Sequence, residues 1–238
     1  LTDGSADPPG SDQFYTERLL RMPDSLWCYR PRDEMPGVNL LPALSNGYIT
    51  FGSLNSSNKI DSACIRIWSR LLLTIRDSRL LIVTVPEGVR RHELIEQFGR
   101  QGVESARLEF FDHLDQDQFF RMYHRIDISL DPINVNGGTT TCESLWMGVP
   151  TLSLIGNRFL SRAGLSILSA AGVKEFAVSN EEEFLRVAKE LTGNLLRLSE
   201  LRAALRGKVS QSPLTDAERF TRYLEGHYLE VWNRWTAE

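Results

Sequence analysis

The residues best suited to chemistry lie in one stretch, 128–154, which reads ISLDPINVNGGTTTCESLWMGVPTLSL. An apolar strand leads into Asn136-Gly137-Gly138, three threonines then open a helix, and Glu143 is expected in the first turn of that helix. Free N–H groups and the positive end of a helix dipole attract an anion, and glycines let the anion approach the backbone. The carboxylate of Glu143 would take a sugar hydroxyl beside the anion. The pattern therefore indicates a cradle for the diphosphate of a nucleotide-sugar.

The same turn also has a purely structural interpretation. Two glycines before Thr139 are an ordinary way to begin a helix, and threonine is a common N-cap residue. Taken alone, the turn leaves both interpretations open, and the decision depends on what the rest of the chain places beside it.

A cationic partner for this turn is expected in the loop FGSLNSSNKID. Lys59 follows a predicted strand there, so its ammonium group could reach a β-phosphate as a mobile point charge. Asn55 and Ser56 could donate hydrogen bonds to the same phosphate. The alternative is that Lys59 is an ordinary loop lysine, exposed to solvent and without a role in binding.

A nucleotide base would find candidates in the segment 110–119, FFDHLDQDQF. Phe119 could stack on the ring, while Asp112 and His113 lie where a base edge would rest. His113 titrates near neutrality but has no recognisable serine or cysteine nucleophile around it, so catalysis by this histidine is disfavoured. Arg158 and Arg162 could either approach a diphosphate or only solvate a helix.

Strand-like and helix-like segments alternate along the chain from residue 48 onward. We predict strands at 48–53, 80–85, 106–111, 128–133, 151–155 and 175–179. We predict helices at 62–72, 90–101, 115–125, 139–147, 161–171, 181–191, 195–209 and 215–235. This alternation predicts an α/β fold with a doubly wound parallel, Rossmann-like sheet. Ligands of such folds bind beyond the carboxyl ends of the strands. Residues 1–47 are proline-rich and are expected to form an arm and linker, with a helical patch at 14–22 and a short strand at 26–29.

Composition excludes several classes of protein. The net charge of -4 argues against an electrostatic nucleic-acid binder. Cys28, Cys64 and Cys142 are far apart without CxxC spacing, which favours a reducing, cytoplasmic location. Four histidines show no HxH or HExxH spacing, so no metal site is predicted, and no apolar run suits a membrane. The chain opens in mid-pattern as LTDGSADPPG, and we expect it to be part of a longer protein.

Several motifs in the same order resemble one family. FGSLNSSNKID, RLLIVTV, LDPINVNGGTTTCESLWMGVP and LSRAGLSIL are similar to the carboxy-terminal half of the catalytic region of the protein O-linked N-acetylglucosamine transferases and their SPINDLY-like relatives. The resemblance implies the carboxy-terminal lobe of a GT-B glycosyltransferase. It implies that 1–47 resembles the tail of the amino-terminal lobe, that 48–213 binds the nucleotide-sugar, and that 214–238 is a closing helix which packs back on the other lobe.

The resemblance also assigns roles to individual residues. By position, Lys59 is the catalytic lysine that contacts the donor diphosphate, Thr139 and Thr140 face the phosphate, and Glu143 holds the ribose. The complete set of implied donor-binding residues is Asn55, Ser56, Gln116, Phe119, Asn136, Gly137, Gly138, Thr139, Thr140 and Glu143.

Some positions depart from the animal enzymes of the family. Gln116 and Phe119 stand where those enzymes have a lysine and a histidine near uracil, Gly138 stands in place of a histidine, and Ser56 in place of a glutamine. NGGTTT is closer to the bacterial and SPINDLY-like branch.

The implied activity is inverting transfer of N-acetylglucosamine from UDP-GlcNAc to protein serine or threonine hydroxyls, with no metal cofactor required. The implied partners are a nucleotide-sugar, a protein acceptor, an amino-terminal catalytic lobe and tetratricopeptide repeats. Two alternatives stay open: a GDP-fucose-dependent, SPINDLY-like protein O-fucosyltransferase, and a non-catalytic nucleotide-binding module. A small-molecule or lipid glycosyltransferase of the same fold is disfavoured, because the chain lacks a basic amphipathic segment that would face a membrane.

Overall fold

Six short apolar segments form one parallel sheet at the centre of the computed structural model, which describes residues 1–237. The strands are β3 (Ile49–Ser53), β4 (Ser78–Ile82), β5 (Leu108–Phe110), β6 (Ile128–Leu130), β7 (Thr151–Leu154) and β8 (Ala177–Val178). Their order is β5-β4-β3-β6-β7-β8, and every neighbouring pair is parallel. The predicted doubly wound sheet is therefore confirmed.

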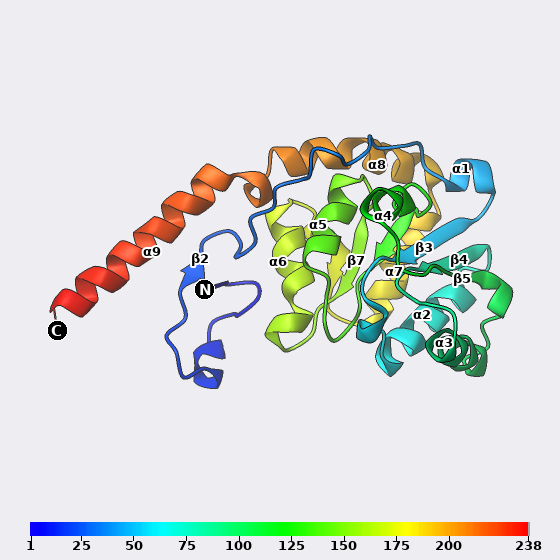
Figure 1. The fold of residues 1–238 in the computed structure, drawn as a ribbon, viewed down its shortest axis with the longest axis horizontal. Coiled ribbons are helices and arrows are strands. Elements are labelled where there is room, and N and C mark those ends of the chain that lie inside the picture. Colours follow the sequence, from blue (N-terminus) through cyan, green and yellow to red (C-terminus); the bar gives the residue numbers. More distant parts are fainter. Residues whose placement is uncertain (238) are drawn as a thin grey trace.

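Helices surround the sheet and connect its strands, whereas the last helix, α9, extends away from it (Figure 1). They are α1 (Ala43–Asn46), α2 (Ser62–Thr74), α3 (Val89–Arg100), α4 (Gln116–Met122), α5 (Thr139–Trp146), α6 (Ala163–Ala170), α7 (Glu181–Thr192), α8 (Leu195–Ser210) and α9 (Ala217–Ala237). Polar side chains define several starts: Asp61 accepts a hydrogen bond from Cys64 N at α2, and Asn180 accepts one from Glu183 N at α7. None of the helices described over residues 1–237 has the length and apolar character of a membrane span.

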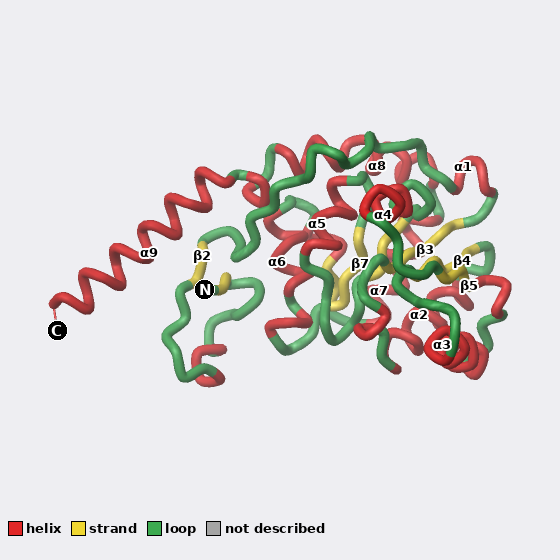
Figure 2. The backbone as a smooth tube through the Cα atoms, in the orientation of Figure 1, coloured by secondary structure: helices red, strands yellow, loops and turns green. Residues whose placement is uncertain are grey.

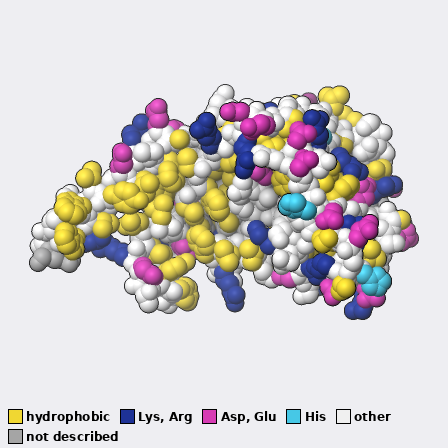
Figure 3. All heavy atoms as spheres, in the orientation of Figure 1, with side chains coloured by type: hydrophobic (Ala, Val, Ile, Leu, Met, Phe, Trp, Pro, Cys, Tyr) yellow, Lys and Arg dark blue, Asp and Glu magenta, His cyan; other side chains and the backbone are white. Residues whose placement is uncertain are grey.

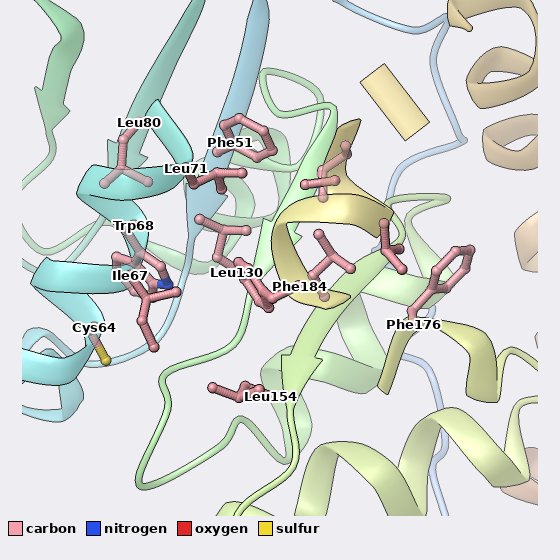
Figure 4. Close-up of a cluster of buried hydrophobic side chains, with 14 of the residues drawn as sticks. Phe51, Cys64, Ile67, Trp68, Leu71, Leu80, Leu130, Leu154, Phe176 and Phe184 are labelled. Atoms are coloured by element: carbon pink, nitrogen blue, oxygen red, sulfur yellow. The ribbon is translucent and has the colours of Figure 1, made fainter. Parts of the chain in front are cut away.

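The larger part of the core lies where α2 and α7 pack on the sheet (Figure 4). Phe51 of β3, Trp68 of α2 and Phe184 of α7 are each fully buried there. Burial of three large aromatic side chains accounts for a substantial part of the hydrophobic stabilisation, since each contributes about 1.5–3 kcal/mol or more. The core therefore holds the strand ends in fixed positions.

The amino-terminal segment differs from our prediction. Neither the helical patch at 14–22 nor the strand at 26–29 is present. The segment instead has a 3-10 helix at Ser11–Phe14 and two short parallel strands, β1 (Thr2–Asp3) and β2 (Arg21–Met22). Arg21 and Met22 pair as a strand with Thr2 and Asp3, so a helix cannot continue to residue 22. The buried carboxylate of Asp3 accepts hydrogen bonds from the N–H groups of Ser5 and Ala6, 2.8 Å each, which stabilise the turn after β1. Downstream, the linker runs along α8 to α1 before entering β3 (Figures 1 and 2).

Two strands, β4 and β6, end three residues before the ends of the apolar runs that predict them. β6 stops at Leu130 because Asp131 and Pro132 begin a turn. β4 stops at Ile82 because Thr84 adopts a left-handed conformation with φ 58°. A β-branched residue rarely adopts such a conformation, which costs about 1–3 kcal/mol.

The strand order reverses between β3 and β6, which lie side by side at the middle of the sheet. In doubly wound folds a crevice opens beyond the carboxyl ends of the two strands at this reversal. The loop after β3 carries Lys59, and the loop after β6 carries the Asn136–Thr140 turn. The topology thus brings together the two segments that the sequence singled out.

Candidate functional site

Lys59 lies against the glycine turn, 77 residues away in the chain. A 3-10 turn at Ser57–Lys59 carries the lysine, whose Nζ donates to the backbone oxygen of Asn136 at 3.0 Å and to Asn55 Oδ1 at 3.3 Å. Thr140 Oγ1 donates to the same Asn55 oxygen at 2.9 Å. Asn55 therefore joins the lysine loop to the start of α5, and the ammonium group points at the predicted phosphate cradle.

Hydrogen bonds to a buried carboxylate fix the glycine turn. Asp131, which follows β6, is 1% exposed, and its Oδ1 accepts from Gly137 N at 3.1 Å and from Thr141 Oγ1 at 2.9 Å. A Cβ at Gly137 would lie 2.4 Å from Thr141 Oγ1, so the close approach requires glycine. The N–H of Gly137 is used within the protein, and a ligand would have to rely on the amides that follow it.

The side chain of Asn136 is likewise committed to the fold. Its amide nitrogen donates to Pro132 O at 2.8 Å, and its Oδ1 accepts from Gly164 N at 3.2 Å. The contribution of Asn136 to the crevice is therefore its backbone oxygen beside Lys59.

The first turn of α5 supplies the anion-attracting groups. Gly138 is the N-cap residue, and the hydrogen bonds to its oxygen begin at Thr141 N and Cys142 N, both 3.1 Å. The N–H groups of Gly138, Thr139 and Thr140 precede these bonds, so they are free to face an anion. Thr139 is exposed and Thr140 half-buried at this helix start.

We predicted Glu143 in the first turn of α5, and this was wrong. α5 begins at Thr139, so Glu143 lies in its second turn. It is buried, 8% exposed, with Tyr123 Oη donating to its Oε2 at 3.3 Å. The same hydroxyl lies 3.1 Å from Thr140 O. Tyr123 thus connects the carboxylate to the threonine start.

The predicted base-binding residues lie on α4. Gln116 is exposed at the first position of that helix, and half-buried Phe119 packs edge-on against Tyr123, with 5.9 Å between ring centroids. Through Tyr123, the ring of Phe119 is therefore connected to Glu143. Ser56 is exposed beside the lysine loop and makes no side-chain cap bond there.

Trp27 of the linker covers the glycine turn. A Cβ at Gly138 would lie 2.5 Å from the Trp27 ring, so the indole fills the space that any side chain at 138 would need. This packing provides a physical reason for glycine at position 138.

Of the two arginines after β7, Arg162 has a structural role. It donates to Ser5 O at 2.8 Å and to Gly156 O at 3.1 Å and so ties the arm to this loop. Arg158 is exposed and lines a cavity of about 450 Å³ beside Ile133 and Asn134. Arg158 thus remains available to a ligand, whereas Arg162 is occupied.

Burial perturbs the ionisable groups of the crevice. It raises the pKa of Asp131 to about 6 and that of Glu143 to about 7, and it lowers the pKa of Lys59, an effect that the Asp131 carboxylate opposes. Clusters of shifted groups in a cleft are typical of functional sites. Within the described residues, no three His, Cys, Asp or Glu side chains group as metal ligands would.

We expect Glu143→Gln to increase the free energy of unfolding at pH 8. A carboxyl group whose pKa is raised by folding stabilises the fold while protonated, and this contribution is lost as the pH rises through about 7. Glutamine stays neutral and can still accept from Tyr123. The gain should be about 1–3 kcal/mol in urea unfolding.

The pH dependence provides the control for this prediction. The advantage of the glutamine variant should shrink at pH 5, where the wild-type carboxyl is protonated in the folded state. A difference that stays constant between pH 5 and pH 8 would show that Glu143 is not the titrating group. Asp131 titrates in both proteins, so its effect cancels.

The model of glycosyl transferase family 41 matches residues 41–224, which include both halves of the crevice. The chain belongs to glycosyltransferase family 41. This family 41 lobe is 38% identical, over 99% of its length, to the probable UDP-N-acetylglucosamine–peptide N-acetylglucosaminyltransferase SPINDLY of Petunia hybrida, and 36% identical to that of Arabidopsis thaliana. It spans 26% of the length of each of these relatives.

Solved structures agree with this assignment. A lysine-to-methionine mutant of the Thermobaculum terrenum O-GlcNAc transferase superposes with a TM-score of 0.89 at 32% identity, over 100% of this chain and 46% of that one. The lipopolysaccharide glycosyltransferase WaaG shares the fold at a TM-score of 0.53 and 13% identity, covering 83% of this chain and 54% of that one. The fold is therefore the GT-B lobe that the resemblance implied.

Sequence reasoning missed three residues that shape the family 41 crevice. Asp131 could have been noticed as an acid directly after a buried strand. Trp27 and Thr84 carry no signal in the sequence, because their roles arise from contacts with residues more than 25 positions away.

Proposed function

We propose that this chain is the donor-binding lobe of a protein O-glycosyltransferase that transfers N-acetylglucosamine from UDP-GlcNAc, with inversion, to serine or threonine hydroxyls. The observation that carries the proposal is the hydrogen-bonded link of Lys59 and Thr140 through Asn55, which places the ammonium group beside the start of α5. Membership of family 41 and the activity for which the SPINDLY relatives are named support it.

In this mechanism the lobe stabilises the leaving group. As the sugar–phosphate bond breaks, negative charge grows on the diphosphate, and Lys59 together with the amides of Thr139 and Thr140 would neutralise it. These groups act in place of a metal ion, so we expect EDTA to leave donor binding unchanged. Ser56 and Gly138 would line the same diphosphate site.

The nucleoside would extend from the diphosphate toward α4. Glu143 would accept the ribose hydroxyls, Phe119 would pack on the base, and the exposed amide of Gln116 would hydrogen-bond its edge. Because Gln116 and Phe119 differ from the lysine and histidine of the animal enzymes, a guanosine-linked fucose is the second candidate donor.

The other wall of the cleft would come from an amino-terminal catalytic lobe. α9 carries exposed apolar side chains, including Tyr228, Leu229, Trp232 and Trp235, each more than half exposed. Hydrophobic side chains gather over the arm and α9 on the face shown in Figure 3. We propose that α9 packs on that lobe in the parent protein, which would also carry tetratricopeptide repeats and act in the cytoplasm on protein acceptors.

A thermal-shift panel of UDP, GDP, UDP-GlcNAc and GDP-fucose tests the donor. We expect the uridine compounds to raise the melting temperature, whereas a response to the guanosine compounds alone would favour O-fucosyl transfer. The same donors with an acceptor peptide and an added amino-terminal lobe test the reaction. Donor binding without transfer in that mixture would identify a non-catalytic module, and no response to any nucleotide would overturn the proposed function.

A further inference from the structure

Thr84, at the end of β4, is an unexpected residue for its backbone conformation. Its φ of 58° interrupts the alternation by which successive side chains of a strand point to opposite faces of the sheet. Val83 lies in the core cluster beside Phe120, and Val85, two residues on, lies in the cluster beside Trp68 instead of returning to the first. The fold needs this kink to bury both valines, but glycine would adopt it without strain.

The hydroxyl of Thr84 makes hydrogen bonds that glycine could not make. Oγ1 accepts a hydrogen bond from Ser57 N at 3.1 Å and donates one to Asn55 O at 3.2 Å. The backbone oxygen of Thr84 also accepts from Ser57 Oγ at 2.8 Å. All three hydrogen bonds go to the short loop Asn55–Ser57, which leads from β3 to Lys59.

That loop sets the orientation of the site. Asn55 is buried, 3% exposed, and its side-chain oxygen accepts from both Lys59 Nζ and Thr140 Oγ1. Arg90 of α3 holds the far end of the loop, by donating to Ser57 O and Ile60 O, but it does not contact Asn55. The hydrogen bond from Thr84 is therefore the one that fixes the backbone of Asn55 itself.

We propose that Thr84 is a positioning residue for donor binding: its hydroxyl fixes the Asn55 loop so that the amide of Asn55 aims Lys59 at the glycine turn. This inference rests on the proposed function, because it assigns Thr84 to the same diphosphate site. It accounts for a strained threonine at a position where glycine would satisfy the fold.

Three substitutions at this position separate the hydroxyl from the backbone conformation. Thr84→Ser keeps the hydroxyl, Thr84→Val keeps the branched shape and its strain, and Thr84→Gly removes both hydroxyl and strain. By calorimetry on the 238-residue chain, we expect UDP affinity near wild type for the serine variant and about tenfold weaker for the valine and glycine variants, as expected for loss of two hydrogen bonds. Thr192→Val, which removes a hydroxyl at the end of α7, is the matched control.

The melting temperature should depend on the backbone strain at residue 84 and not on the hydroxyl. We expect Thr84→Gly to melt at a higher temperature than Thr84→Val, because both lack the hydroxyl and only valine is strained. Wild-type affinity in the glycine variant would overturn the inference and leave the proposed function intact, since the threonine would then serve only the kink. A wild-type chain that binds neither UDP nor GDP would instead overturn the proposed function, and with it this role of Thr84.

Discussion

Replacing Lys59 with alanine is expected to weaken UDP binding by about a hundredfold. Lys59 Nζ lies 3.0 Å from Asn136 O, beside the free amides of α5, and its half-buried charge would face the diphosphate. A hydrogen bond to a charged group contributes about 1.5–3 kcal/mol, and each 1.4 kcal/mol is a factor of ten in affinity. Isothermal calorimetry on the 238-residue chain measures the change.

Lys189→Ala is the control for this experiment, because Lys189 is an exposed lysine on α7 outside the crevice. It should leave UDP affinity unchanged. Equal affinity in the Lys59 variant and the wild type would refute the role of Lys59 and remove the main support for a diphosphate site.

Replacing Arg202 with alanine is expected to lower the free energy of unfolding by about 3–5 kcal/mol. Arg202 on α8 is 1% exposed, and its guanidinium donates to the backbone oxygens of Asn39 at 3.0 Å, Ile126 at 2.9 Å and Tyr123 at 3.0 Å. Truncation would leave these buried oxygens without their donor, and a cavity beside them.

Urea unfolding measures this effect, with Arg197→Ala as the control. Arg197 lies on the same helix but is exposed, so its loss should change stability by less than about 0.5 kcal/mol. Similar stabilities for the two variants would show that the buried guanidinium does not join α8, the linker and the start of β6 as the structure indicates.

Much of the sheet could be predicted because its signals are local. Apolar runs such as residues 80–85 and cap residues such as Asp61 specify strands and helix starts without reference to distant residues. The errors arose where a distant or competing contact decides the backbone. Thr84 ends β4 through its left-handed φ, and pairing with Thr2–Asp3 keeps Arg21–Met22 extended where a helix was expected.

The candidate site was predictable to the same extent. Residue types and places after strands made Lys59 and the glycine turn candidates, and the family resemblance favoured a functional role for both. The structure brings them together. The depth of Glu143 was missed although the start of α5 was predicted correctly, because its burial depends on packing with distant residues such as Tyr123. The roles assigned to Gln116, Phe119 and Ser56 stay predictions until a donor is bound.

By itself, the sequence determined the strand–helix alternation, and hence the crevice at the strand reversal, because periodicity and helix caps act over a few residues. Only the tertiary structure decided which groups face that crevice. Asp131 accepts the hydrogen bond from the N–H of Gly137, so that amide cannot bind a ligand. Trp27 excludes a side chain at position 138. Asn55 joins Lys59 to Thr140 through hydrogen bonds. Each of these contacts depends on packing between segments far apart in the chain, which no local pattern encodes.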